Sequence, residues 1–155
     1  MKNSPTSVVS RMALTAGLGL LLGLPGLSPA DDDAGKALQG VWRGARFSSG
    51  KGEDPEKGVK LELIFKNNQI HGKRLPEEQA IGTGAFKLSA DGKTIDAVGT
   101  SGGFKGKTFP GIFKIEGDTL LWCTTTSGNA ADRPTEFAAS PAKKSYLIIV
   151  KRQKP

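Results

Sequence analysis

Apolar and polar residues alternate with a period of two along much of this 155-residue chain, on either side of short turn signals. The segment Val59–Lys66, VKLELIFK, has an apolar residue at every second position, which predicts a strand with one buried face. Asn67-Asn68 follows it, and asparagine tolerates the positive φ that a tight two-residue turn needs. A turn there pairs Phe65 with Ile70 on the inner face and puts His71 on the outer face.

Two further turn signals give the same inner face. A two-residue turn at Asp91-Gly92 puts Phe86 inside and places Lys87 opposite Asp96 on the outside. A turn at Gly117-Asp118 forms a third hairpin, with an aromatic pair on its inner face. The three hairpins together predict one interior set of aromatic side chains: Phe65, Phe86, Phe113 and Trp122.

A first strand near residues 40–47 and a last strand near residues 145–152 bring the expected number of strands to eight, joined mostly in sequence order. Before them, the acidic segment Asp31–Gln39 predicts a short helical turn. A meander of strands removes its exposed edges by closing on itself. We therefore expect an all-β fold: an eight-stranded antiparallel up-and-down barrel with a short N-terminal helical turn, enclosing either a packed core or one small ligand.

The first thirty residues have the features of a secretory signal peptide. A basic start with Lys2 and Arg11 precedes the apolar run Met12–Leu24, and small residues stand before the expected cleavage point. A membrane-spanning helix needs about 20 apolar residues, so this run is too short for one. We expect residues 1–30 to be removed and residues 31–155 to form the mature domain, periplasmic or extracellular and without stable membrane insertion.

The chain contains one histidine and one cysteine, which leaves few residues for catalysis or metal binding. His71 is expected on the solvated outer face. Cys123 shares a strand face with Leu121, opposite Trp122, so it is expected outside the barrel. Its thiol has three alternative states: free, buried, or paired with a second molecule. Burial is the favoured state. The segment Ser101–Thr108 differs from a P-loop at one position, but a strand is expected after it instead of the required helix. We expect no enzyme activity, cofactor or metal site.

Basic residues exceed acidic residues by 22 to 15 over the whole chain, and the C-terminal region is rich in lysine. A nucleic-acid surface needs a denser stripe of basic residues with interleaved aromatic ones, and the expected export also argues against such a partner, so no nucleic-acid partner is expected. Contact with acidic envelope polymers remains an alternative to plain solubility.

Gly40-Val41-Trp42, which follows the helical turn and opens the first strand, resembles the Gly-x-Trp signature of lipocalins. In that fold the tryptophan closes one end of the barrel and a basic residue of the last strand stacks on it. The resemblance gives these structural roles to Trp42 and Arg152.

Five groups of residues, spread over nearly all of the mature chain, carry a second similarity: Leu38-Gln39-Gly40-Val41-Trp42, Gly111-Ile112-Phe113, Gly117-Asp118-Thr119-Leu120 with Cys123, Arg133-Pro134-Thr135-Glu136-Phe137 and Lys151-Arg152. Together they resemble an uncharacterised family of small exported lipocalin-like domains abundant in planctomycetal genomes. Trp122 is bulkier than the residue expected at its place in that family. The resemblance implies a lipocalin-like barrel and carries no activity over to this chain.

Strand parity places Arg46 inside the barrel near its open end, on the same face as Trp42. An inward arginine there would recognise a carboxylate or phosphate group of a ligand. Two alternatives remain: the side chain extends into water, or it pairs with Glu53 or Glu56 of the following loop.

Two functions remain open. The first is an exported binding domain for a small apolar or amphipathic molecule. The second is a structural or protein-interaction module of the cell envelope, whose core is filled by the interior aromatic residues. A cavity of about 300 Å³ or more favours the first function. The candidate partner is a small apolar or anionic molecule, the sequence identifies no protein partner, and the expected ligand-binding residues are Arg46, Phe65, Phe86, Phe113 and Trp122.

Overall fold

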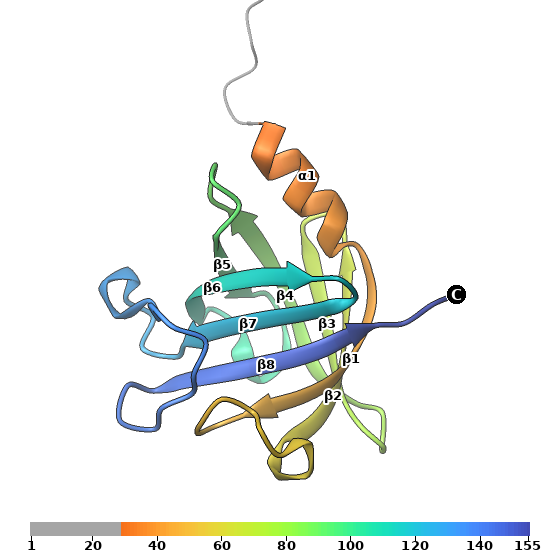
Figure 1. Cartoon of the computed structure of the whole chain (residues 1–155), viewed down its shortest axis with the longest axis vertical. Helices are drawn as coiled ribbons and strands as arrows, with labels where there is room; N and C mark the ends of the chain where they lie inside the picture. Colours follow the sequence, from red (N-terminus) through yellow and green to blue (C-terminus); the bar gives the residue numbers. More distant parts are fainter. Residues whose placement is uncertain (1–28) are drawn as a thin grey trace, which may run out of the picture.

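Eight antiparallel strands follow one another around a closed barrel, in the order in which they occur along the chain (Figure 1). The computed structural model describes residues 29–155, with side chains from residue 33 onward. The predicted signal peptide lies almost entirely outside the described residues. The strands are β1 (Gly40–Phe47), β2 (Val59–Lys66), β3 (Gln69–Arg74), β4 (Gln79–Leu88), β5 (Thr94–Gly99), β6 (Thr108–Glu116), β7 (Thr119–Thr125) and β8 (Ser145–Arg152).

The helical elements are short. The helix α1 (Pro29–Leu38) includes most of the predicted helical turn, and the three single-turn 3₁₀ helices are η1 (Pro55–Lys57), η2 (Gly102–Phe104) and η3 (Ala130–Asp132). No helix among the described residues is long and apolar enough to cross a membrane. The segment that resembles a P-loop ends in the strand β6, as the sequence predicted, and not in a helix.

The predicted register of all three hairpins is confirmed. Phe65 pairs with Ile70. Lys87 pairs with Asp96, and Phe113 pairs with Trp122 in the third hairpin. Period-two alternation fixes which face each side chain takes, so a correct turn position gives every pair in its hairpin.

One of the three turns differs from the prediction in its form. The turns at residues 67–68 and 117–118 contain two residues, with positive φ at Asn67 and Gly117. The third connection is longer. The backbone amide of Ser89 donates to Thr94 O at 3.1 Å, and this hydrogen bond closes a loop of the four residues 90–93. In this loop the Asp91 carboxylate accepts hydrogen bonds from the Ser89 hydroxyl and from the Lys93 amide. The hydrogen bond from Ser89 is the main cause that lowers the Asp91 pKa.

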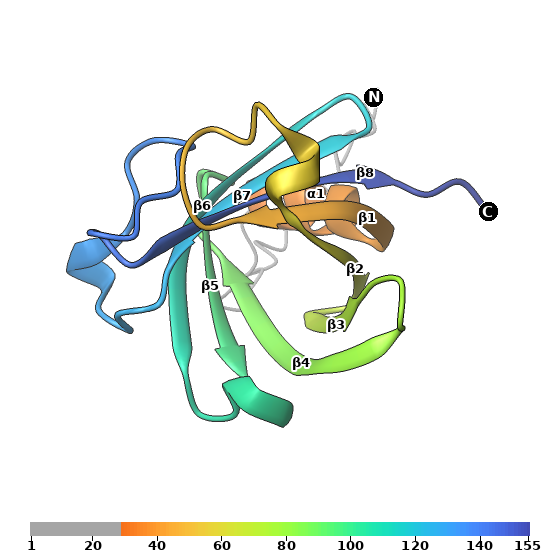
Figure 2. The same ribbon diagram turned by 90° about the horizontal axis from the view of Figure 1, so that it is seen from below.

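The two ends of the barrel differ because the strand direction alternates. The three short turns and α1 lie at one end, which we call the closed end. The four longer connections lie at the other, the open end; they comprise residues 48–58, 75–78, 100–107 and 126–144. Figure 2 shows the ring of strands that joins the two ends.

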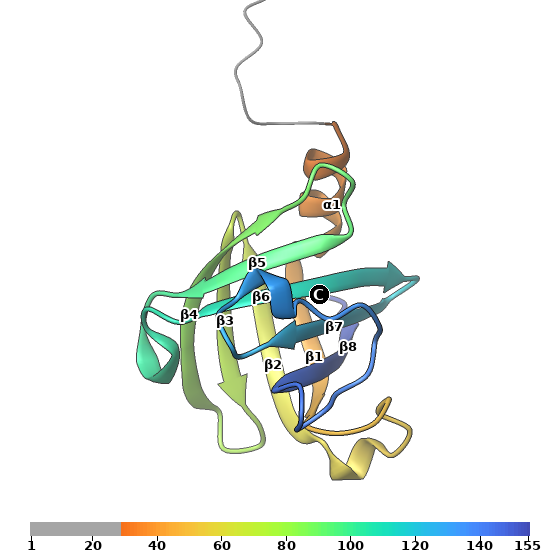
Figure 3. The same cartoon turned by 90° about the vertical axis from the view of Figure 1, so that its left-hand side faces the viewer.

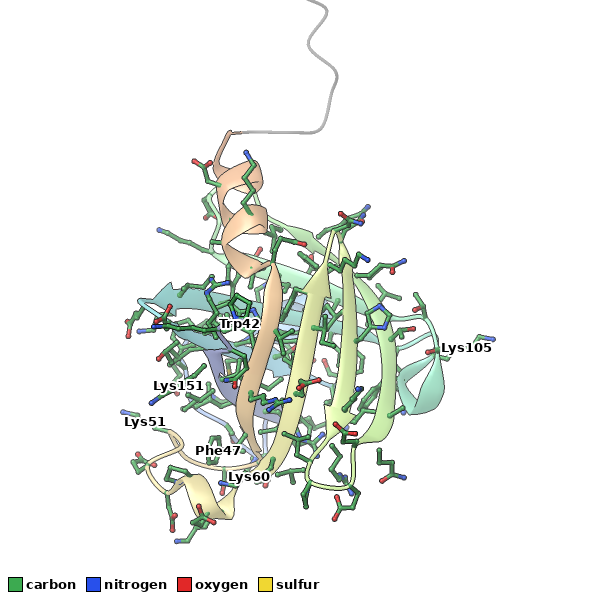
Figure 4. All side chains as sticks on the ribbon, turned by 90° about the vertical axis from the view of Figure 1, so that its right-hand side faces the viewer. Trp42, Phe47, Lys51, Lys60, Lys105 and Lys151 are labelled. Atoms are coloured by element: carbon green, nitrogen blue, oxygen red, sulfur yellow. The ribbon has the colours of Figure 1, made fainter. Side chains whose placement is uncertain are left out.

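Trp42 and Arg152 meet at the closed end and hold the end of α1. The Arg152 guanidinium lies 4.2 Å from the centre of the Trp42 ring. The Trp42 indole nitrogen donates to Leu38 O at 2.8 Å, and Arg152 donates to Gln39 O at 2.8 Å and to Ala37 O at 2.6 Å. These side chains satisfy carbonyl groups that the helix terminus leaves without partners. Figure 4 shows Trp42 on β1 just beyond the end of α1.

Apolar side chains form two separate cores. The inner core fills the closed half of the barrel and contains the predicted aromatic set, together with Trp42 and Leu38. The outer core lies outside the barrel wall, where the chain after β1 and the chain after β7 meet in the bridge between Gly50 and Ala139. Its buried residues are Ala45, Phe47, Cys123, Ala139 and Leu147. Segment 126–144 crosses the outer face of the barrel at this place (Figure 3).

Candidate ligand cavity

A cavity of about 500 Å³ occupies the open half of the barrel. Its walls are inward-facing residues near the open ends of the strands, and most of the lining is apolar. The side chains that form the apolar wall and floor include Leu61, Leu63, Ile70, Ile81, Trp122 and Ile148. The inner core therefore fills the barrel only in part.

Two of the five predicted binding residues, Arg46 and Trp122, line the cavity. The other three, Phe65, Phe86 and Phe113, are buried in the inner core and do not line it. Phe65 stacks edge to face on Phe86, with ring centres 5.5 Å apart, and on Trp122, with ring centres 6.3 Å apart. The expectation that all four aromatic residues line the site is therefore corrected. Parity identified the face of the sheet on which these residues lie. Which inward side chains border the cavity depends on how they pack against one another, and parity does not determine this packing.

The Arg46 side chain lines the cavity and stacks on Tyr146, with the guanidinium carbon 4.6 Å from the ring centre. The predicted alternative of a pair with Glu53 or Glu56 is not observed: Glu53 accepts from the backbone amide of Lys51, and Glu56 pairs with Lys60 at 3.3 Å. Within the described part of the chain, Arg46 has no carboxylate within ion-pair distance. Its guanidinium is therefore held in place by an aromatic face and lacks a counter-charge.

Two further cations line the cavity, Arg74 at the end of β3 and Lys107 just before β6. Sequence reasoning missed both. The signal for Arg74 was present, because the register that pairs Phe65 with Ile70 also pairs Leu61 with Arg74 and so turns Arg74 inward. No comparable signal exists for Lys107, because it lies in the connection before β6. The alternation of apolar and polar residues does not determine the path of a connection.

Close backbone packing positions the connection 100–107 at the mouth of the cavity. Gly82 has a φ of +149°, and a Cβ atom there would lie 2.5 Å from Ser101 O. A Cβ atom on Gly99 would lie 1.9 Å from Phe104 O. Glycine at both positions lets the connection approach β4 and β5, and Phe104 then packs edge to face on Phe109 with ring centres 5.4 Å apart.

Cys123 and His71 both lie away from the cavity. Cys123 is fully buried in the outer core, and its thiol donates to Ala138 O at 3.4 Å. Burial is the main cause that raises the pKa of this thiol, so it is a poor nucleophile at neutral pH. His71 pairs with Ile64 on the outer face. The described residues contain no group of three or more acidic, histidine or cysteine side chains able to hold a metal ion.

No protein-family model, curated protein or solved structure matches the chain. The barrel, its cavity and the cations that line it are therefore the observations on which a functional proposal rests.

Proposed function

We propose that this chain is an exported lipocalin-like domain that binds one small, largely apolar molecule inside its barrel. The observation that carries the proposal is the cavity of about 500 Å³. Small-molecule sites have volumes of about 300 to 1,000 Å³ and are mostly apolar with a few polar groups. The volume and lining of this cavity agree with both criteria.

The closed end supports the lipocalin-like assignment. Gly40-Val41-Trp42 opens the first strand, and Arg152 of the last strand stacks on Trp42. This contact is the one that the resemblance to lipocalins implies. The wider likeness to small exported lipocalin-like domains remains part of the proposal.

The alternative function is a structural or protein-interaction module with a filled core. That function requires the aromatic residues to occupy the barrel from end to end. Phe65, Phe86 and Phe113 instead lie in the inner core below the cavity. The space that they leave at the open half favours ligand binding over the alternative.

The proposed function needs no covalent step. Among the described residues, those that line the cavity include no histidine, cysteine, aspartate or glutamate, which are common acids, bases and nucleophiles of enzymes. The lining residues instead offer apolar surface, hydroxyl groups and cations. This combination suits reversible binding.

A titration with Nile red, a neutral apolar dye whose emission shifts to the blue in apolar surroundings, tests the proposal. We expect saturable binding of about one dye molecule per protein molecule, with blue-shifted emission. Mass spectrometry of small molecules that remain on the protein purified from its native host would then identify candidate ligands. If Nile red does not bind saturably, the cavity is not a binding site and the filled-core function becomes the better account.

A further inference from the structure

All the charged residues that line the cavity, within the part of the chain that the structure describes, are basic. They are Arg46, Arg74 and Lys107. Strand parity agrees with the placement of the two arginines: Arg46 pairs with Val59 and Ile148, Arg74 pairs with Leu61, and the paired residues line the cavity as well. Three cations therefore surround an apolar space that contains no acidic side chain to neutralise them.

Arg46 has the geometry of a receptor for an anion. One face of its guanidinium is covered by the Tyr146 ring at 4.6 Å, which leaves the in-plane N–H groups at its edge free to donate. Within the described residues, neither the Arg46 guanidinium nor the Tyr146 hydroxyl has a hydrogen-bond partner. Since Arg46 is only half-exposed, its charge gains more from a bound anion than it would in open water.

The other two cations are more exposed and lie around the mouth. Arg74 and Lys107 are both exposed, and no ion pair or side-chain hydrogen bond to another described residue holds either one. Exposed charges of one sign at the mouth of a low-dielectric cavity attract an oppositely charged ligand over a distance of about 10 Å at moderate salt. Arg74 and Lys107 therefore favour the approach of an anion toward Arg46.

We propose that the molecule bound in the barrel is an amphipathic oxyanion, with its carboxylate or phosphate head group on Arg46 and its apolar tail against Trp122 and Ile70. This inference rests on the proposed binding function and adds the chemical class and the orientation of the ligand. An apolar tail alone would leave its direction in the cavity unspecified, whereas a charge at one end and an apolar floor at the other end fix it.

Four ligands with the same ten-carbon chain separate the charge of the head group from the tail: decanoate, decyl phosphate, decanol and decyltrimethylammonium. Each is titrated against bound Nile red at low and at moderate salt. For the unchanged protein we expect at least one of the two anions to displace the dye at a concentration about tenfold or more below that of decanol. The cation should be the weakest competitor. Comparison of decanoate with decyl phosphate shows which head group is preferred.

The variant Arg46→Met keeps an apolar side chain of similar length and removes the charge. We expect it to abolish most of the preference for anions over decanol, with each ligand compared against the affinity of the variant itself for Nile red. Arg46→Lys should restore part of the preference, because it restores the charge without the planar donor edge. Lys151→Gln is the matched control: Lys151 is exposed on the outer side of β8, so its loss changes the net charge equally and should leave the preference unchanged.

Two results would overturn the inference while leaving the binding function intact: decanol displacing Nile red as well as both anions do, or Arg46→Met and Lys151→Gln reducing the preference equally. Failure of the binding function itself looks different, because then neither the dye nor any of the four ligands binds.

Discussion

At the scale of single residues, Trp42 has two roles: it fills the closed end of the barrel, and it forms a hydrogen bond to the end of α1. Its ring is fully buried at the closed end, and its indole nitrogen caps the end of α1 through Leu38 O. Arg152 adds a second cap from the last strand. The two residues therefore join the first strand, the last strand and the helix in one contact.

Trp42→Ala should lower the free energy of unfolding by about 3 to 5 kcal/mol, because a large buried side chain and a buried hydrogen bond are lost. Arg152→Ala should cost less, about 1 to 2 kcal/mol, since the Arg152 side chain is partly exposed. Urea unfolding of both variants measures these differences. Trp42→Phe, which keeps an aromatic ring, is the control and should fall between the parent protein and Trp42→Ala. Equal losses for Trp42→Ala and Arg152→Ala would contradict this account of the closed end.

Cys123 gives a prediction on pH. Burial raises its pKa in the folded protein, whereas the thiol of the unfolded chain ionises near its ordinary pKa of about 8.5. Above that pH the unfolded chain releases a proton that the folded protein keeps, so the free energy of unfolding falls as the pH rises. We expect a steeper fall between pH 8 and pH 10 for the parent protein than for Cys123→Ala, measured by urea unfolding at each pH. Parallel curves for the two proteins would contradict the burial of this thiol.

At the scale of elements, segment 126–144 is the largest part of the fold that alternation does not describe. It is fixed to the barrel wall by Arg133, which donates to Gly111 O at 2.8 Å and pairs with Asp96 at 2.7 Å. Lys114 also lies 4.9 Å from the centre of the Phe137 ring. These contacts hold the segment over the outer face of the barrel (Figure 3). There the segment covers Cys123, whose thiol donates to Ala138 O.

Arg133→Ala should make local opening of this segment easier by about 1 kcal/mol, which is about a fivefold change in the open population. The readout is the rate at which a thiol reagent labels Cys123 in the native protein, and we expect that rate to rise about fivefold. Lys143→Ala changes an exposed lysine of the same segment and should leave the rate unchanged. If the two variants are labelled equally fast, Arg133 does not hold the segment.

Hairpins could be predicted from the sequence because two local signals, the turn position and the period of two, determine every pair between the two strands of one hairpin. The outer core could not be derived in this way, since it forms between segments that are far apart along the chain. A partial signal was present in β8, where Leu147, Ile148, Ile149 and Val150 are all apolar. A continuous apolar run indicates burial on both faces.

The candidate site could be predicted only in part from the sequence. Parity placed Arg46 and Trp122 on the inner face, and both line the cavity. Parity could not distinguish residues that line the cavity from residues that fill the barrel beneath it, which is why Phe65, Phe86 and Phe113 were assigned to the site. Whether an inward side chain borders the cavity depends on how the inner core packs, which involves strands far apart along the chain.

At the scale of the whole molecule, export remains a prediction from the N-terminal sequence. Small residues at Ser28 and Ala30 favour cleavage just before Asp31. N-terminal sequencing of the protein purified from its native host should therefore begin at Asp31. A native protein that begins at Met1 would contradict both the cleavage and the proposed export.

The proposed function requires the open half of the barrel to hold a ligand, so a variant that fills this space should lose binding. Gly72 lies on an inward position of β3, and a Cβ atom there would meet Ile81 and Leu63 at 3.6 and 3.7 Å, which are ordinary contacts. Gly72→Leu can therefore add a side chain among the lining residues without a backbone clash. Gly35→Leu adds the same side chain in α1, where a Cβ atom meets no atom within 4 Å.

The deciding measurement is the dissociation constant of Nile red for these two variants, with unfolding curves to confirm that both fold. We predict that Gly72→Leu raises the dissociation constant about tenfold or more, which corresponds to about 1.4 kcal/mol of binding free energy, and that Gly35→Leu leaves it unchanged. Equal dye binding by folded Gly72→Leu and the parent protein would contradict a ligand site in the barrel.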